Sequence, residues 1–331
     1  MINSELTTYN EETRKAYELY SRGSYGEALD CYYKLSRDFG ATVFSANIAL
    51  CLFKLRGDRE LLLSAHRALC CKQEYDGLRE SCQGKLVVSL TSYPQRIQIA
   101  VLAIKSILQQ SLKPSRTILW LSDEQFPNKE RDLPSELLLL QNDGLSIGWC
   151  EDIKSYKKLI PALKNFPEDV IVTADDDILY ERHWLAELVV NHIEFPDDII
   201  CHRAHRVSVN KSNGFAPYNE WQMDIKHAEA SYGCLFTGCG GVLYPPRSLH
   251  KSVLNQALFS SVCSSGDDIW FWAMAVLNRT KIRIVRKSSF KLNCIDGSQG
   301  DNALWRTNYG EKRNDTMLRA LHSLHPHIQA C

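Results

Sequence analysis

The spacing of apolar residues along the chain changes near residue 84. Before that point apolar residues recur every three or four positions, the spacing of a helix that buries one face. Ala16, Leu19 and Tyr20 share such a face, and residues 23–25 form an expected turn before a second helix. After residue 84, short aliphatic runs alternate with helical patterns. We therefore expect an all-helical segment over residues 1–83 and an α/β domain over residues 84–331.

Four segments in the second part are rich in apolar residues and have the length of buried strands. They cover residues 85–90, 117–121, 145–149 and 170–173, with helical patterns over 97–108 and 157–166 between them. This alternation predicts a mostly parallel sheet flanked by helices. Ligands of such a sheet bind beyond the carboxyl ends of its strands. We therefore expect the polar residues at and after the strand ends (residues 91–96, 122–123, Asp152 and residues 175–177) along one rim.

The helical segment resembles tetratricopeptide repeats. Gly23, Tyr25 and Ala28 have the Gly-x-Tyr-x-x-Ala spacing of the turn in these repeats, and a weaker copy follows after a period of about 34 residues. The helices of that copy are expected over residues 46–52 and 62–69. Two repeats bury little core alone, so we expect this segment to bind a protein partner, self-associate or dock on the rest of the chain. A plain helical extension is the alternative.

Composition and charge limit the partners and the compartment. The 331 residues include 39 basic and 39 acidic side chains, so the net charge is zero and we expect no nucleic-acid partner. No signal-peptide pattern opens the chain, and no apolar run is long enough to span a bilayer. The 12 cysteines include no Cys-x-x-Cys pair. We expect a cytoplasmic protein with reduced cysteines, and any membrane attachment to be peripheral at the inner face.

Two acidic clusters carry the clearest chemical signal. Asp175, Asp176 and Asp177 follow the strand expected over residues 170–173. Adjacent carboxylates repel one another when they are partly desolvated, so a divalent cation or basic side chains should compensate them. Carboxylate oxygens suit Mg²⁺ or Mn²⁺, which complete their shells with phosphate oxygens and water. A solvated acidic turn is the alternative interpretation.

The second cluster, Asp267 and Asp268, follows Gly266 at the start of an apolar helix expected over residues 269–277. The helix dipole favours carboxylates there, so a simple N-cap is one interpretation. The other makes Asp268 a general base that takes a proton from an attacking hydroxyl. Between the two clusters, the glycine-rich residues 238–241 allow a ligand to approach the backbone closely, although a tight turn at a strand edge has the same composition.

Five segments together resemble bacterial sugar-nucleotide glycosyltransferases of the GT-A type, which typically build capsule or lipopolysaccharide glycans. The segments cover residues 88–97, 152–163, 173–180, 238–246 and 266–272, in the order of the family. The resemblance implies a GT-A fold, which is α/β and Rossmann-like. It also implies a nucleotide-diphosphate-sugar donor, a divalent Mn²⁺ or Mg²⁺ ion, and an oligo- or polysaccharide acceptor, including lipid-linked ones.

The resemblance implies a donor site built from three segments. The residues that would contact the nucleotide, with Lys158 facing phosphate, are Thr91, Ser92, Tyr93, Arg96, Asp152, Lys158, Asp175 and Asp176. Asp175 and Asp177 match the family's Asp-x-Asp motif, which binds the ribose and a metal on the diphosphate. A C-terminal histidine completes the metal shell in some enzymes of this type, and His325 is the candidate here. The alternative for His325 is an ordinary loop histidine.

The remaining assignments concern the base and the acceptor. Asp268 matches the base of inverting members, and Asp267 stands where many relatives have Glu, so the division of roles between the two stays open. Gly240 and Gly241 would line the sugar and acceptor side. The last candidates, which would bind an anionic acceptor or else form a solvated surface, are Arg203 and His205.

The function predicted from the sequence is metal-dependent transfer of a sugar from a nucleotide diphosphate to a glycan hydroxyl, with inversion, in surface polysaccharide biosynthesis. Two alternatives stay open. The first is a catalytically silent scaffold that binds partners through its helical repeats. The second is a metal-dependent phosphoesterase or nucleotidyltransferase, because clustered aspartates also serve phosphoryl chemistry.

Overall fold

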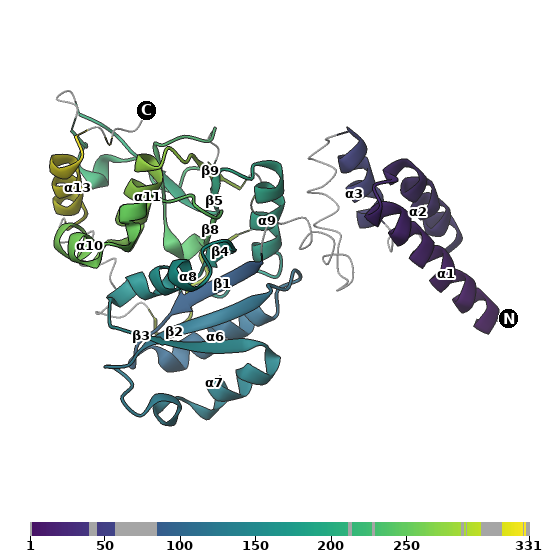
Figure 1. The fold of residues 1–331 in the computed structure, drawn as a ribbon, viewed down its shortest axis with the longest axis horizontal. Coiled ribbons are helices and arrows are strands. Elements are labelled where there is room, and N and C mark those ends of the chain that lie inside the picture. The colour runs from purple at the N-terminus through teal and green to yellow at the C-terminus, as the bar shows by residue number, and fades with distance from the viewer. Residues whose placement is uncertain are drawn as a thin grey trace. The chain divides into compact units, whose positions relative to one another are not determined.

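A computed structural model describes residues 2–39, 45–56, 85–210, 214–226, 229–285, 288, 290–298, 313–326 and 328. The chain divides into two compact units, Met1–Leu78 and Arg79–Cys331 (Figure 1). Each unit has a hydrophobic core of its own. No helix within the described ranges is both long and apolar enough to cross a membrane.

The first unit contains the helices α1 (Ile2–Ser21), α2 (Tyr25–Phe39) and α3 (Ser45–Arg56). The expected turn between the first two is confirmed, and Gly23 occupies it with a φ of 86°, a conformation that favours glycine. The core of this unit consists of Ala16, Leu19, Ala28, Tyr32, Leu35 and Cys51. The helix expected over residues 62–69 lies outside the described residues, so the tetratricopeptide assignment stays a prediction.

The second unit is built on a seven-stranded sheet with the order β3-β2-β1-β4-β8-β5-β9. Its strands are β1 (Leu86–Thr91), β2 (Arg116–Ser122), β3 (Leu145–Cys150), β4 (Val170–Thr173), β5 (Ile199–Cys201), β8 (Val242–Tyr244) and β9 (Ile282–Ile284). All neighbouring strands are parallel except that β8 runs antiparallel to β4 and β5. A separate two-stranded sheet pairs β6 (Ala204–Arg206) with β7 (Cys234–Phe236). The predicted α/β class with a mostly parallel, helix-flanked sheet is confirmed.

The helices of this unit are α6 (Ile97–Leu108), α7 (Ser135–Leu139), α8 (Ile160–Asn165), α9 (Trp184–Glu194), α10 (Gln256–Val262), α11 (Asp267–Leu277) and α13 (Arg313–Leu324). The helix expected over residues 157–166 is divided: Lys154–Lys158 forms the 3₁₀ helix η3, and α8 starts only at Ile160. Pro161 explains the break, because proline fits the first turn of a helix and disrupts its interior. Figure 1 shows α10, α11 and α13 gathered on one side of the sheet.

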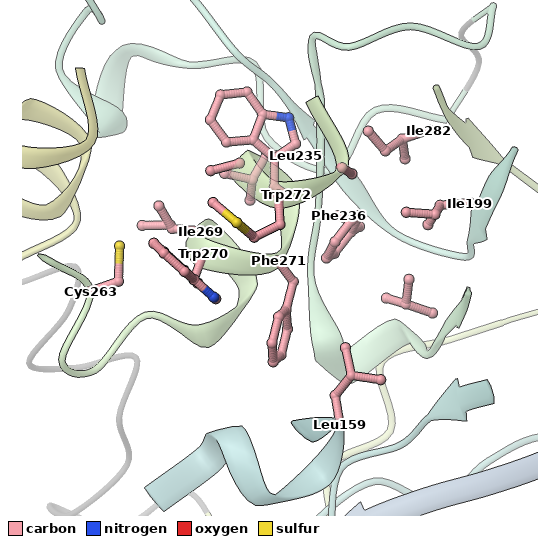
Figure 2. Close-up of a cluster of buried hydrophobic side chains, with 14 of the residues drawn as sticks. Leu159, Ile199, Leu235, Phe236, Cys263, Ile269, Trp270, Phe271, Trp272 and Ile282 are labelled. Atoms are coloured by element: carbon pink, nitrogen blue, oxygen red, sulfur yellow. The ribbon is translucent and has the colours of Figure 1, made fainter. Parts of the chain in front are cut away.

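Helix α11 is the centre of the main core. Trp270, Phe271 and Trp272 are completely buried. Figure 2 shows their side chains fanning out in different directions, with Phe271 directed toward Leu159 and Trp270 toward Cys263. Because the helix is packed on several sides, its first turn, which carries the second acidic cluster, has a fixed position in the fold.

The order of the strands brings the expected rim together. β1 and β4 are parallel neighbours, with Ser89 opposite Thr173. The loops that leave them therefore start side by side at one edge of the sheet. This is the crevice in which open α/β sheets bind ligands, because chain connections diverge there to the two faces.

Candidate functional site

A cavity of about 1140 Å³ opens at this edge of the sheet. Its walls come from the loops after β1 and β4, from η3, from residues near β6 and β7, and from the start of α11. The sequence-predicted residues that line it are Thr91, Ser92, Tyr93, Arg96, Asp152, Lys158, Asp175, Asp176, Asp177, Arg203, His205, Asp267 and Asp268. Residues from distant parts of the chain thus share one cavity.

The cavity lining does not include the predicted rim residues Ser122 and Asp123, or the candidate site residues Gly240, Gly241 and His325. A Cβ on Gly240 would lie 2.9 Å from the Cβ of Arg203, and a Cβ on Gly241 would lie 2.4 Å from the ring of Trp184. These glycines therefore allow close packing in the fold. His325 lies at the end of α13, where burial and the charge of His250 lower its pKa. Its proposed contact with a metal stays a prediction.

The loop after β4 is held by side chains of the loop after β1. The guanidinium of Arg96 lies 3.0 Å from Asp176 Oδ1 and 2.7 Å from Asp177 Oδ2. The Ser92 hydroxyl donates a 2.6 Å hydrogen bond to Asp176 Oδ2. Burial raises the pKa of Asp176 to about 6, although Arg96 and Ser92 oppose this effect. Ser92 and Arg96, which the resemblance assigned to the nucleotide, therefore also organise the acidic loop.

Lys158 joins the two acidic clusters. Its ammonium lies 3.0 Å from Asp175 Oδ1, 2.9 Å from Asp267 Oδ2 and 3.6 Å from Asp268 Oδ1. Burial disfavours the charged amine, yet the three carboxylates outweigh it and raise the pKa of Lys158 well above its usual value. The Lys158 ammonium thus lies among carboxylates, whereas the resemblance implied that it faces phosphate.

The two aspartates of α11 differ in accessibility. Asp267 is 7% exposed, its Oδ1 accepts a 2.8 Å hydrogen bond from the Ser155 hydroxyl, and its Oδ2 faces Lys158. The Asp268 side chain keeps 30% of its surface accessible and lines the cavity. Its Oδ2 accepts a 2.8 Å hydrogen bond from the Gly238 amide, whereas no hydrogen-bond donor reaches its Oδ1 in the described part of the chain.

The environment of Asp268 favours its protonated form more than water does. Burial, together with the neighbouring carboxylates of Asp267 and Asp175, raises the pKa of Asp268 to about 7, although Lys158 and the Gly238 amide oppose the shift. Neither aspartate caps α11 through its side chain, since Gly266 is the N-cap and no side-chain cap bond forms. A carboxylate with a pKa near neutrality is suited to general-base chemistry.

Asp152 belongs to a second polar network that the sequence did not indicate. Its Oδ1 lies 2.7 Å from the Lys157 ammonium, and its Oδ2 accepts a 2.9 Å hydrogen bond from the Gln125 amide. Burial opposes ionisation, but the bond from Lys157 and the Lys154 backbone amide lower the pKa of Asp152. Gln125 follows β2 on the predicted rim, which is the signal that could have identified it.

The cavity wall that contains Arg203 and His205 carries less positive charge than the sequence suggested. Burial lowers the pKa of His205 to about 4, so this residue is neutral near pH 7. Arg203 lies 3.6 Å from Asp224 and donates a hydrogen bond to the Thr237 hydroxyl. Tyr218 lines the same region and could not be identified beforehand, because an isolated tyrosine in a loop carries no distinguishing pattern.

The carboxylates suit a divalent ion only together with another ligand. In the described part of the chain, no group of three or more His, Cys, Asp or Glu side chains could hold a metal alone. The ion pairs above place two cations, Lys158 and Arg96, among five carboxylates. The remaining negative charge and the hard oxygen donors fit Mg²⁺ or Mn²⁺, which are commonly bound by one or two carboxylates plus substrate phosphates.

Comparisons with known proteins give only distant similarity. No protein-family model and no curated protein matches the chain. Two similar solved structures are of residues 1–349 of TarS from S. aureus. The one in complex with UDP has a TM-score of 0.39 and 14% identity, and the match covers 60% of this chain and 57% of that chain. The other has a TM-score of 0.40 and 15% identity, over 73% and 72% of the two chains. Similarity at this level does not assign a function.

Proposed function

We propose that the chain is a glycosyltransferase that moves a sugar from a nucleotide diphosphate to a hydroxyl of a glycan acceptor. The observation that carries this proposal is the meeting of the two acidic clusters at one cavity. One cluster follows a parallel strand at the ligand-binding edge of the sheet, and the other places Asp268 across from it, with Lys158 between them. The reaction needs the charge of the leaving diphosphate to be compensated and the proton of the acceptor hydroxyl to be removed. Each need then has its own acidic cluster.

Asp268 is the proposed base. Its side chain is 30% accessible and lines the cavity, while its Oδ1 is buried 3.6 Å from the Lys158 ammonium. It would take the proton of the acceptor hydroxyl as that oxygen attacks the sugar carbon, and one base on the attacking side is what an inverting transfer requires. Asp267 is buried between Ser155 and Lys158, so it supports the site rather than accepting the proton.

Asp175 and Asp177 would hold the divalent ion together with the donor's diphosphate. When bound, the ion neutralises the charge that develops on the leaving diphosphate. Asp152, Thr91 and Tyr93 line the cavity and would contact the base and ribose. The metal dependence, the role in surface polysaccharide synthesis and a partner-binding role for the helical unit all belong to this proposal.

A thermal-shift screen tests the donor class. Wild-type protein is heated with UDP, GDP, CDP and ADP, each with and without Mn²⁺. A ligand that binds the native state raises the melting temperature by mass action, so one diphosphate should give a shift that Mn²⁺ increases. Asp177→Ala should abolish the Mn²⁺-dependent part. Asp169→Asn, at the opposite end of β4, is the matched control and should respond like the wild type.

The screen, together with an analysis of the products released from a nucleotide sugar, separates the two alternatives. A scaffold without a nucleotide site predicts no shift with any diphosphate. A phosphoesterase or nucleotidyltransferase predicts release of phosphate or pyrophosphate from a bound nucleotide sugar. The proposed transfer predicts that the nucleoside diphosphate is released intact.

A further inference from the structure

Lys158 is buried at the wall of the cavity, and hydrogen bonds fix the position of its backbone. The Lys158 side chain is 7% exposed although it lines the cavity. Its backbone carbonyl accepts a 2.6 Å hydrogen bond from the Ser89 hydroxyl in β1, and Ser89 in turn accepts a 3.0 Å bond from the Trp120 indole in β2. Lys158 is therefore anchored to two central strands of the sheet.

The glycine at position 238 leaves room for this ammonium. A Cβ on Gly238 would lie 2.3 Å from Lys158 Nζ, 2.9 Å from Asp268 Oδ1 and 3.4 Å from Asp175 Oδ1. The backbone amide of the same glycine donates to Asp268 Oδ2. The fold thus presents a fitted space in which one cation meets carboxylates from β4 and α11.

Arg96 is less enclosed than Lys158. The Arg96 side chain is 15% exposed, and it pairs with Asp176 and Asp177 of the acidic loop and with neither aspartate of α11 in the described ion pairs. A lysine ammonium has three N–H donors, and Lys158 has three carboxylates within 3.6 Å. Its position between the two clusters suits it to hold the protein's own carboxylates in place.

We propose that Lys158 is a positioning residue: its buried ammonium holds Asp268, the base, beside Asp175, the donor-side aspartate, with Asp268 Oδ1 buried 3.6 Å from the ammonium and the rest of the side chain at the cavity. Without this cation, three carboxylates in one enclosed space would repel one another. Asp268 would then turn away or stay protonated, and in either case it could not accept the acceptor's proton. The catalytic part of this inference rests on the proposed function. The clamp, by which we mean the hold of the Lys158 ammonium on Asp268 and Asp175, does not.

The first test measures the clamp without any substrate. Urea unfolding is compared for wild type, Lys158→Met, Asp268→Asn and the double variant. If the ammonium holds Asp268, the two substitutions are strongly non-additive, because each removes the partner of the other. Additive effects would overturn the clamp. If Lys158→Met does not fold, the same cycle is run in an Asp267→Asn background, which removes one of the repelling carboxylates.

The second test measures the catalytic consequence through hydrolysis of the nucleotide sugar whose diphosphate gives a shift in the screen above. Lys158→Met should lower kcat by about 10²–10⁴, the range for loss of general-base catalysis, while the diphosphate-induced thermal shift changes little. Lys158→Ala should regain part of its kcat with ethylammonium and not with the bulkier tetramethylammonium. Lys164→Met, an exposed lysine of α8, is the control and should behave like the wild type.

The outcomes separate this inference from the proposed function. Near-normal kcat in folded Lys158→Met, or no recovery of Lys158→Ala with ethylammonium, would overturn the positioning role while leaving the transferase intact. No diphosphate-induced shift and no hydrolysis in wild type would instead contradict the proposed function, and the unfolding cycle would still decide whether Lys158 clamps Asp268.

Discussion

At the scale of single residues, the central feature is a carboxylate whose ionisation is costly in the folded protein. The pKa of Asp268 is raised to about 7 by burial and by two neighbouring carboxylates. A raised carboxylate pKa means that the folded chain binds a proton more tightly than the unfolded chain does. The stability linked to this proton is therefore fully present below about pH 4 and is lost as the pH rises through about 7.

Asp268→Asn should accordingly stabilise the protein at high pH. Asparagine keeps the shape of the side chain without the charge, so it avoids the cost of ionisation. We expect a rise in melting temperature of about 2–4 °C at pH 8, which corresponds to roughly 1 kcal/mol in a domain of this size, and no rise at pH 4. A variant that is less stable than wild type at pH 8 would contradict this electrostatic interpretation.

Gly241 provides a second prediction at this scale. Its φ is +84°, and an added Cβ would lie 2.4 Å from Trp184. Gly241→Ala should therefore lower the free energy of unfolding by more than about 2 kcal/mol, from backbone strain and overpacking together. Gly144→Ala is the control, because Gly144 also has a positive φ, of +104°, but no atom within 4 Å of an added Cβ. Urea unfolding should show a clearly smaller loss for the control, and equal losses would rule out the contact with Trp184.

At the scale of elements, the strands that the sequence predicted are those rich in apolar residues. β1 to β4 were recognisable because apolar residues make up most of each, as in Leu-Val-Val of β1 and Val-Ile-Val of β4. β8 was not, because it has three residues between a glycine-rich segment and Pro245. The division of the helix before Pro161 was missed because Lys157 and Lys158 fit a helical pattern in the sequence. In the structure both lysines belong to η3, where they bind the carboxylates of Asp152 and Asp175.

The link between β1, β2 and η3 can be tested at Ser89. Ser89→Ala leaves the buried Trp120 indole and the Lys158 carbonyl without this partner. We expect a loss of about 1–3 kcal/mol in the free energy of unfolding, the usual cost of unsatisfied buried polar groups, together with lower donor hydrolysis. Ser261→Ala, on the exposed face of α10, should leave both quantities unchanged. Loss of stability with full activity would show that Ser89 supports the core and not the site.

At the scale of the whole molecule, the sequence identified most of the charged residues that line the cavity, because several of them follow strands that end at one edge. It could not identify the pairing among them. Which cation meets which carboxylate depends on side-chain packing between distant segments, as Lys158 and Asp267 show. Gln125 was missed although it follows β2, and Tyr218 because an isolated loop tyrosine carries no pattern. Gly240 and Gly241 pack the fold instead of lining the cavity.

The excess of carboxylates at the cavity predicts that metal and nucleotide bind together. Calorimetric titration of Mn²⁺ into the free protein should show weak binding, because Lys158 and Arg96 already neutralise part of the cluster. With the diphosphate identified by thermal shift present, the Mn²⁺ affinity should rise at least about tenfold, since phosphate oxygens complete its shell. Equal affinity with and without the nucleotide would exclude this shared site.

The most direct measurement is the product formed from the nucleotide sugar whose diphosphate stabilises the protein, followed by chromatography in wild type and Asp268→Asn. We predict that wild type releases an intact nucleoside diphosphate and that Asp268→Asn loses at least about 10² in this rate while still binding the diphosphate. Release of phosphate or pyrophosphate by wild type, or an undiminished rate in Asp268→Asn, would contradict a sugar transfer that uses Asp268 as its base.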